Sequence, residues 1–562
     1  MTKTVAASTG LLLAIAAACG ASSTTDAPSG ESAGGAAGYG GEAGKAGATA
    51  AAGKSGSTAS AGTAGASGQA GAGIGGASGG GDGGVDASDA NADTDASNDV
   101  VDASMDVLDA SNDVLDASND VVDETPPPTG KILPIVPCNE TLDAVYVAPG
   151  GLPPMTPAHR GDVVRCAGDT LLDVATVQQQ LDAKALPDVI ATTGTQLVRI
   201  AYRTERADGV AGIGTARVYL PTTPLPAPIP LIVIAHPSEG LADGCAPSRN
   251  PSSLQDLALP WAARGYAVIA PDYAGLGNEG TQGYLDNRDT AHSVLDAARA
   301  LRKMLTKGWL SPKVAIFGHS QGGGAALSAQ ALAASYGLDG ELAAVAVFAP
   351  EWPSRLASFG FLQLLAQPTT PTVFTGITKP VVAELLAYAR SRNGGATPYD
   401  QVAPMATAAG LADAAETQCL QAYGGYLQGV ALTVGDLFST AERDALTACV
   451  AAKGGAGCAP PGKDLYDFLA SNVLAGDPKG AKILYVQGLL DTIMPPAEEA
   501  ACNLGKLAID GVFPQVCTDQ TGIHTNVVVN NIVFSMKWAE AVLAGAPPPT
   551  CDASGMPSCT LP

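Results

Sequence analysis

Short hydrophobic runs rich in Val and Ile alternate with longer Ala- and Leu-rich stretches after about residue 131. Runs of four to eight such residues are typical of buried strands, whereas the longer stretches are typical of helices. This pattern predicts strands at Val198–Thr204, Gly214–Leu220, Leu231–His236, Tyr266–Pro271, Lys313–Gly318, Ala343–Phe348 and Ile483–Gly488.

The order of these runs predicts an α/β fold with a mostly parallel central sheet. The stretch Leu231–Ala235 is apolar throughout, which indicates a sheet covered by helices on both faces. No helical stretch separates the first two strands, so we expect them to pair antiparallel. The later strands alternate with helices, which favours parallel pairing through right-handed crossovers.

The first part of the chain lacks this pattern. Residues 20–81 are mostly Gly, Ala, Ser and Thr, and four seven-residue repeats follow from Asp95, Asp102, Asp109 and Asp116. Segments of this composition cannot bury enough apolar surface to offset their chain entropy. We therefore expect residues 19–130 to be a disordered tether that ends in an acidic spacer. Calcium binding by the repeats is the alternative, although the Gly and terminal Glu of an EF-hand loop are missing.

The charge of the chain is concentrated in this spacer. The formal net charge is 30 − 54 = −24, and thirteen Asp and one Glu lie between Asp82 and Glu124 without any Lys or Arg. The rest of the chain carries 30 − 40 = −10. A nucleic-acid partner is excluded, because such proteins need a basic face.

The N-terminus has the features of an export signal. Lys3 precedes the apolar run Leu11–Ala18, which is followed by Cys19. This run is too short to span a bilayer, so residues 1–18 are predicted to be a signal peptide. Cys19 resembles the lipid-modified cysteine of bacterial lipoproteins, and ordinary cleavage after Ala18 is the alternative. We therefore expect an exported protein held at the outer membrane or cell surface by a lipid anchor; the alternative is a secreted protein.

The cysteines agree with an oxidising compartment. Eleven are present, and lipidation of Cys19 leaves ten, an even number that suits disulfide bonding. Neighbours in sequence, Cys551 with Cys559 and Cys502 with Cys517, are candidates for local pairs. No C-x-x-C spacing occurs, so we expect no zinc site, and we expect no metal or other cofactor.

One motif carries specific chemistry. The predicted strand that ends at Phe317 leads into Gly318-His319-Ser320-Gln321-Gly322, and a helical stretch of small residues follows. Strand, G-x-S-x-G and helix in this order form a nucleophile elbow, which predicts Ser320 as a catalytic nucleophile. The elbow places its serine at a helix N-terminus, where backbone N–H groups lack partners.

Such a serine needs two backbone N–H groups to bind the oxyanion of the reaction. Gln321, the residue after the nucleophile, should supply one. The other should come from Ser238 or Glu239, because Pro237 in the same loop has no N–H.

A general base is also required, and elimination favours His524. The other four histidines lie inside the elbow, at a strand end, in a predicted helix and before the core strands: His319, His236, His292 and His159. Asp491 follows the last predicted strand, 33 residues before His524, and is the preferred acid. Glu351, one strand earlier, is the alternative, and Asp272 is expected to be structural.

Several segments resemble the secretory lipase family, the lipase A-like α/β-hydrolases. They are Gly265–Gly277, Ser293–Ala297, the GHSQGG elbow, Gly488–Pro495, the His524 segment and Cys245–Ser248. The resemblance covers about residues 131–545 and implies the α/β-hydrolase fold with Ser320, Asp491 and His524 as its triad. It also implies a helical cap inserted after the sixth core strand, at residues 354–477, between two parts of the core at 131–353 and 478–562.

The sequence therefore predicts a serine carboxylic-ester hydrolase, a lipase or esterase, that acts on small-molecule or lipid esters through an acyl-enzyme. A serine peptidase of the same fold is one alternative. The other is a non-catalytic surface-binding protein that carries a degenerate hydrolase domain.

Overall fold

The structure is a computed structural model, and it describes residues 126–251, 255–352, 361–363, 365, 367 and 378–560. The chain divides into two compact units, Met1–Leu115 and Asp116–Pro562, and all the described residues belong to the second. The predicted signal peptide, Cys19 and the Asp repeats lie outside the described residues.

The described residues contain one nine-stranded sheet, in the order β1-β2-β3-β5-β4-β6-β7-β8-β9. The strands are β1 (Val163–Leu172), β2 (Thr195–Glu205), β3 (Ala211–Pro221), β4 (Ile229–Ala235), β5 (Ala267–Pro271), β6 (Leu310–His319), β7 (Glu341–Phe348), β8 (Lys482–Gly488) and β9 (Gln515–Asp519).

The seven predicted strands are confirmed as β2 to β8, and the first two form an antiparallel pair as expected. β1 with β2 and β3 with β5 are also antiparallel, whereas all pairs from β5 to β9 are parallel. The hydrophobic pattern missed β1 and β9, which lie at the two edges of the sheet. In β1 only Cys166 and Ala167 are buried, and in β9 only Cys517 is buried, so neither strand forms a continuous apolar run.

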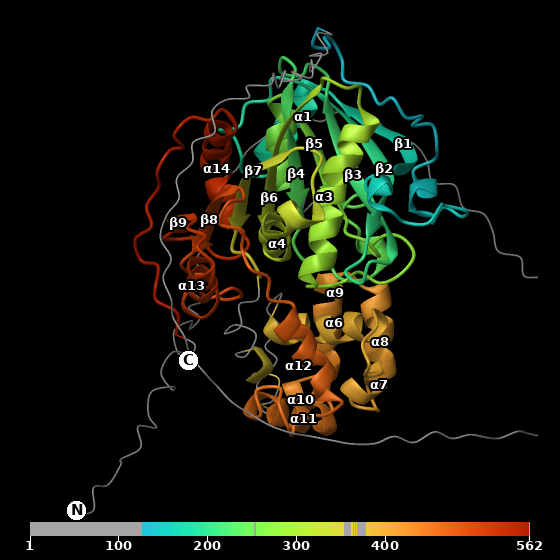
Figure 1. Cartoon of the computed structure of the whole chain (residues 1–562), viewed down its shortest axis with the longest axis vertical. Helices are drawn as coiled ribbons and strands as arrows, with labels where there is room; N and C mark the ends of the chain where they lie inside the picture. The colour runs from blue at the N-terminus through green and yellow to red at the C-terminus, as the bar shows by residue number, and fades with distance from the viewer. Residues whose placement is uncertain are drawn as a thin grey trace, which may run out of the picture. The chain divides into compact units, whose positions relative to one another are not determined.

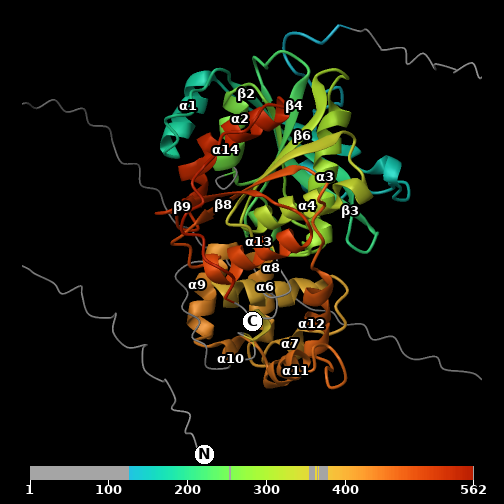
Figure 2. The same ribbon diagram turned by 60° about the vertical axis from the view of Figure 1, so that its left-hand side comes forward.

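Helices cover both faces of this sheet (Figures 1 and 2). Along β4, Leu231 and Val233 pack into the cluster on one face, and Ile232 and Ile234 pack into the cluster on the other. The first face is covered by α3 (Asn287–Met304), α4 (Gln321–Tyr336) and α13 (Ala501–Ile509), and the second by α1 (Val174–Ala183), α2 (Gln255–Ala263) and α14 (Val527–Leu543). Burial of both faces is the reason that the strand is apolar throughout.

Between β7 and β8 the chain forms a separate group of helices, drawn in orange in Figure 1. These helices are α6 (Lys379–Arg392), α7 (Tyr399–Val402), α8 (Ala408–Thr417), α9 (Leu420–Val430), α10 (Val434–Leu437), α11 (Thr440–Ala451) and α12 (Gly462–Ser471). They enclose their own apolar cluster, which includes Leu385, Leu411 and Leu446, and which also takes in Tyr284 and Leu285 from the loop before α3. We call this group the inserted helices. The segment boundaries given above remain predictions.

Single-turn elements complete the described chain. Three are 3₁₀ turns and one is a π turn: η1 (Asp143–Tyr146), η2 (Pro157–His159), η3 (Asp243–Cys245) and η5 (Pro496–Ala500).

Five disulfides use the ten cysteines that remain after Cys19. They are Cys138–Cys166, Cys245–Cys419, Cys449–Cys458, Cys502–Cys559 and Cys517–Cys551. The predicted pairs of Cys551 with Cys559 and Cys502 with Cys517 are wrong. The C-terminal segment runs back along β9, where Thr518 N–H donates to Asp552 O (2.8 Å), so each cysteine meets a partner distant in sequence.

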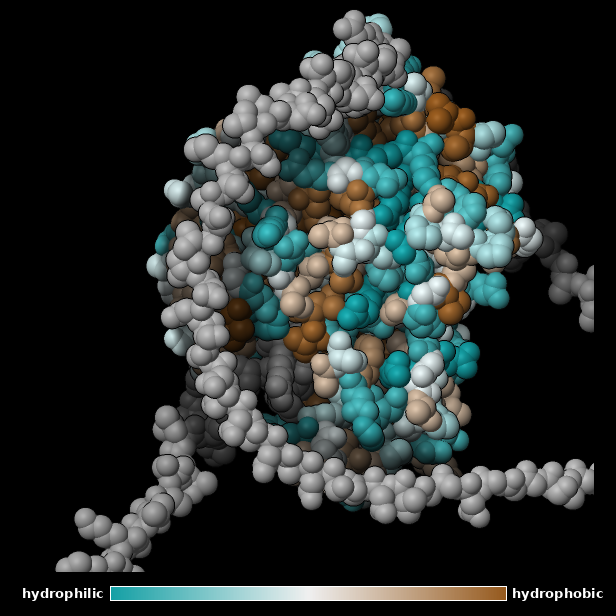
Figure 3. All heavy atoms as spheres, viewed as in Figure 1, coloured by the Kyte–Doolittle hydropathy of each residue, from teal (hydrophilic) through white to brown (hydrophobic). Residues whose placement is uncertain are grey.

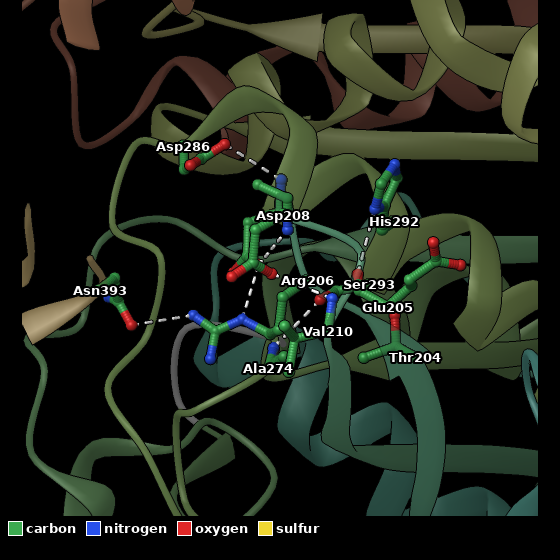
Figure 4. A network of polar contacts seen from close by, with 12 residues as sticks. Thr204, Glu205, Arg206, Asp208, Val210, Ala274, Asp286, His292, Ser293 and Asn393 are labelled. Carbon is green, nitrogen blue, oxygen red and sulfur yellow. Dashed lines mark hydrogen bonds and ion pairs between the residues drawn. The ribbon is translucent and has the colours of Figure 1, made fainter. Parts of the chain in front are cut away.

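Covalent and polar contacts join the inserted helices to the sheet domain. Cys245–Cys419 links the loop after β4 to the start of α9, and beside it Leu420 N–H donates to Glu239 O (2.9 Å). A second contact centres on Arg206 at the end of β2 (Figure 4). Its guanidinium donates to Asp289 Oδ1 of α3 (2.6 Å) and to Asn393 Oδ1 after α6 (3.2 Å). Together they fix the position of the inserted helices over the sheet.

Within the described part of the chain, no helix combines the length and the hydrophobicity needed to cross a membrane. Hydrophobic and hydrophilic residues are interspersed on the face shown in Figure 3.

Candidate active site

Ser320 lies in the sharp turn between β6 and α4, as the motif predicts. Its φ of 54° and ψ of −121° are unusual for a residue with a side chain and show a strained backbone. The strained conformation of Ser320 persists because the surrounding backbone is packed too closely for the turn to relax. A Cβ at Gly318 would collide with Gly322 O, and one at Gly322 would collide with Ala235 O of β4. Both motif glycines are therefore required by close backbone approach.

Hydrogen bonds hold the Ser320 backbone on both sides. Its N–H donates to Phe348 O at the end of β7 (3.0 Å), and its carbonyl accepts from Gly324 (3.1 Å) and Glu351 (2.9 Å). Only 5% of the residue is exposed, so the hydroxyl sits below the protein surface. These backbone hydrogen bonds, to the end of β7 and within the elbow, position the serine.

His524 and Asp491 meet beneath the surface, on the loops after β9 and β8. His524 Nδ1–H donates to Asp491 Oδ2 (2.8 Å), and 4% and 3% of these residues are exposed. The other carboxylate oxygen of Asp491 accepts from the N–H groups of Ile493 and Met494 (both 2.8 Å). Within the described chain, His524 Nε2 has no hydrogen-bond partner. The carboxylate thus holds the proton on Nδ1 and leaves the Nε2 lone pair available as a base.

His319, inside the motif, supports the loop that carries His524. Its Nε2–H donates to the His524 carbonyl oxygen (2.9 Å), and the two ring centroids are 4.8 Å apart. Burial and the neighbouring His524 together lower the pKa of His319 to about 3, so the ring is neutral. The sequence did not predict this contact between His319 and His524. Nothing in the sequence pattern pairs these two positions.

The other three histidines are engaged elsewhere. His236 is buried after β4, donates from Nδ1 to Pro237 O (2.6 Å) and stacks on Tyr273. Its burial lowers its pKa to about 4. His292 stacks on Tyr336. It also contacts Glu205 O, as Figure 4 shows. His159 pairs with Asp162 near the start of the described chain.

The two predicted oxyanion residues lie on segments that pack against each other. Gln321 is the first residue of α4, where N–H groups lack intrahelical acceptors. A Cβ at Gly322 would come within 2.6 Å of His236 O, so the loop after β4 lies directly on the elbow. Further along that loop, the Ser238 hydroxyl is hydrogen-bonded to Tyr284 (2.8 Å), which fixes its place.

Asp272 holds the Cys245–Ser248 segment in place through buried hydrogen bonds. It is buried after β5 and accepts hydrogen bonds from Ser248 N–H (2.7 Å), the Ser248 hydroxyl and the Thr215 hydroxyl (2.7 Å). Burial, partly offset by these hydrogen bonds, raises its pKa to about 6. The carboxyl thereby anchors the Cys245–Ser248 segment, in line with the structural role expected for it.

Glu351, the alternative acid, does not meet His524; the histidine's Nδ1 partner is Asp491. The Glu351 side chain instead lines a cavity beside Met494 and Glu499. No group of three or more His, Cys, Asp or Glu side chains suited to a metal ion occurs among the residues described.

Comparison with known proteins places this arrangement in a class. The secretory lipase family model matches residues 256–385, which include the elbow. This match confirms the resemblance found in the sequence. No curated protein matches the chain.

Solved structures show the same fold at low sequence identity. The cell-wall-degrading esterase LipA from Xanthomonas oryzae is 20% identical, with a TM-score of 0.51, over 68% of this chain and 97% of that one. Candida antarctica lipase A in its closed state is 17% identical, with a TM-score of 0.51, over 72% of this chain and 86% of that one. A putative hydrolase from Legionella pneumophila is 19% identical, with a TM-score of 0.53, over 66% and 97%.

The predicted α/β-hydrolase fold is therefore confirmed. The family match and this fold support a carboxylic-ester hydrolase as the class of the protein. The family and the five disulfides also point to an exported protein.

Proposed function

We propose that this protein is a lipase or esterase that works through a Ser320–His524–Asp491 triad and an acyl-enzyme. One observation carries the proposal: the hydrogen bond from His524 Nδ1 to Asp491 Oδ2, which leaves Nε2 free to act as a base. The strained turn at Ser320 and the family match around it support the same assignment.

In this mechanism, Ser320 Oγ attacks the ester carbonyl carbon while His524 Nε2 takes the hydroxyl proton. Backbone N–H groups of Gln321 and Ser238 bind the oxyanion of the tetrahedral intermediate. The intermediate collapses, and the alcohol leaves with the proton from His524. A water molecule then attacks the acyl carbon while His524 takes its proton. The second tetrahedral intermediate collapses, the acid leaves, and Ser320 Oγ regains the proton from His524. Every step uses side chains and backbone of this chain together with water.

The test is loss of ester hydrolysis on removal of the nucleophile or the base. Ser320→Ala and His524→Ala should each reduce kcat on 4-nitrophenyl butanoate to near background, because the two groups act as one unit. Ser335→Ala, at an exposed position on α4, is the matched control and should keep full activity. A fluorophosphonate probe should label the wild type and not Ser320→Ala. Full activity in Ser320→Ala would refute the mechanism.

The same assay separates the two alternative functions. A peptidase would cleave aminoacyl 4-nitroanilides faster than simple esters, and a degenerate binding domain would cleave neither. We expect ester hydrolysis to dominate, because the family match is to secretory lipases.

We further propose that Cys19 carries a lipid anchor and that residues 19–130 are a spacer between the membrane and the enzyme. The sequence around Cys19 and the low-complexity composition after it support this proposal. Cys19→Ser should move the protein from the membrane fraction to the soluble fraction with unchanged turnover. Retention of the variant at the membrane would contradict the anchor.

A further inference from the structure

A cavity lies beside the proposed triad, between the sheet domain and the inserted helices. Its apolar walls come from α6, α12 and the loops before α3 and after β8, and include Leu285, Val382, Leu386, Leu469 and Met494. The volume that the centre of a water molecule can reach in it is about 40 Å³. The cavity therefore suits a short organic group.

Hydrogen bonds connect this cavity to both ends of the proposed triad. Glu351, in its wall, donates its N–H to the Ser320 carbonyl (2.9 Å). Ile493 and Met494, also in its wall, donate their N–H groups to Asp491. A group bound in the cavity would thus lie next to the turn of the nucleophile and the loop of the acid.

The Glu351 carboxyl is the unusual feature of the wall. Glu499 and Lys379 also face the cavity, and they form an ion pair with each other (3.1 Å). No hydrogen bond or ion pair joins the Glu351 side chain to any residue that the structure describes. Burial, together with the nearby Glu499 carboxylate, raises the pKa of Glu351 to about 8. At neutral pH the carboxyl is therefore protonated and has an O–H to donate.

We propose that Glu351 is a specificity-determining residue whose carboxylic acid donates a hydrogen bond to an oxygen atom in a short acyl or alcohol group of the substrate. The enzyme would then favour esters with an ether, keto or hydroxyl oxygen over hydrocarbon esters of equal length. This inference rests on the proposed function and adds a substrate preference to it. A cationic substrate group is less suited to the cavity, because the Lys379 ammonium lies in the same wall.

The test compares esters that differ in one oxygen atom. The acyl pair is 4-nitrophenyl methoxyacetate with 4-nitrophenyl butanoate, and the alcohol pair is 2-methoxyethyl acetate with butyl acetate. The ratio of kcat/KM within each pair, compared between wild type and variants, cancels the intrinsic reactivity of the esters. Glu351→Leu removes the donor, Glu351→Ala removes it with less bulk, and Glu351→Gln replaces it with an amide N–H.

We expect Glu351→Leu and Glu351→Ala to lower the kcat/KM ratio roughly three- to tenfold in one of the two pairs. This factor corresponds to the loss of one hydrogen bond. Glu351→Gln should retain most of the preference for the ester with the additional oxygen atom. A purely structural role of the carboxyl does not predict this difference between Gln and the donor-free variants. Glu341→Gln, exposed at the opposite end of β7, is the control and should leave both ratios unchanged. Melting temperatures establish that each variant is folded.

The outcomes separate this inference from the proposed function. If Ser320→Ala abolishes butanoate hydrolysis but neither ratio changes in Glu351→Leu or Glu351→Ala, the role of Glu351 is overturned and the function stands. If Ser320→Ala stays active, the function itself fails. If Glu351→Leu lowers kcat/KM most for a choline ester, the Glu351 carboxylate is ionised and binds a cation. That result would also overturn the inference.

Discussion

Replacing Asp491 with Asn should disable the proposed base without disturbing the fold. One oxygen of Asp491 accepts from the Ile493 and Met494 N–H groups, both at 2.8 Å, and the other accepts from His524 Nδ1–H. In the Asn variant the carbonyl oxygen satisfies the two backbone donors, so the NH₂ group must face His524. The ring then has to accept at Nδ1 and carry its proton on Nε2, where it cannot take the proton from Ser320.

The expected size of the effect follows from this tautomer change. Losses of about 10⁴-fold in kcat are typical when the acid of such a triad becomes an amide. That factor corresponds to about 5.4 kcal/mol of activation free energy, at about 1.36 kcal/mol per factor of ten. Glu351→Gln should change butanoate turnover by less than about threefold, because a protonated carboxyl and an amide are both neutral and similar in size.

The assay measures kcat and KM for 4-nitrophenyl butanoate at pH 7.5, with melting temperature as the folding control. The reasoning is refuted if Glu351→Gln is inactive and Asp491→Asn retains most of its activity, because the acid would then follow β7. If neither substitution matters while Ser320→Ala is inactive, the enzyme works as a Ser–His dyad.

Three further predictions concern stability. Gly324→Ala should lower the free energy of unfolding by roughly 1–3 kcal/mol, because the added Cβ would collide with Glu351 O. The control is Gly425→Ala in α9, which should not destabilise the protein because nothing lies within 4 Å of the added Cβ. Equal denaturant midpoints for the two variants would contradict the packing argument. Removing Cys245–Cys419 by a double Ala substitution should cost about 5 kcal/mol in the chain-entropy treatment of its 174-residue separation, and an unchanged midpoint in urea would show that this loop closure contributes little. Burial raises the pKa of Glu384 in α6 to about 8. The stability that its bound proton contributes is therefore full below the unfolded pKa of about 4.5 and is lost as pH rises through 8. The melting temperature should fall between pH 5 and pH 8.5, and less so in Glu384→Gln; an identical fall in both would rule out this carboxyl as a cause.

The elements of the sheet and the position of the nucleophile are readable from local sequence. β4 is apolar at every position because both of its faces are covered, and this leaves a continuous run. The elbow is equally local: Gly318 and Gly322 are needed within a few residues of Ser320, since a side chain at either would collide with nearby backbone. The hydrophobic pattern did not predict the edge strands β1 and β9, because most of their positions are partly or fully exposed and leave no continuous apolar run.

The tertiary structure decided which residues distant in the sequence pair with one another, both in the disulfides and in the contact of His524 with its acid. Cys502 and Cys517 bond to Cys559 and Cys551 because the C-terminal segment folds back along β9, a path that no spacing rule encodes. Asp491 and Glu351 both follow strands of the same sheet, so the sequence left both as candidates for the acid. Only the packing of the loops after β8 and β9 brings Asp491 to His524, and it leaves Glu351 in a cavity wall whose other side is built by inserted helices. Local pattern determines where strands, helices and the strained turn form, because these depend on neighbouring residues. Contacts between side chains that are distant in the sequence depend on the three-dimensional path of the whole domain.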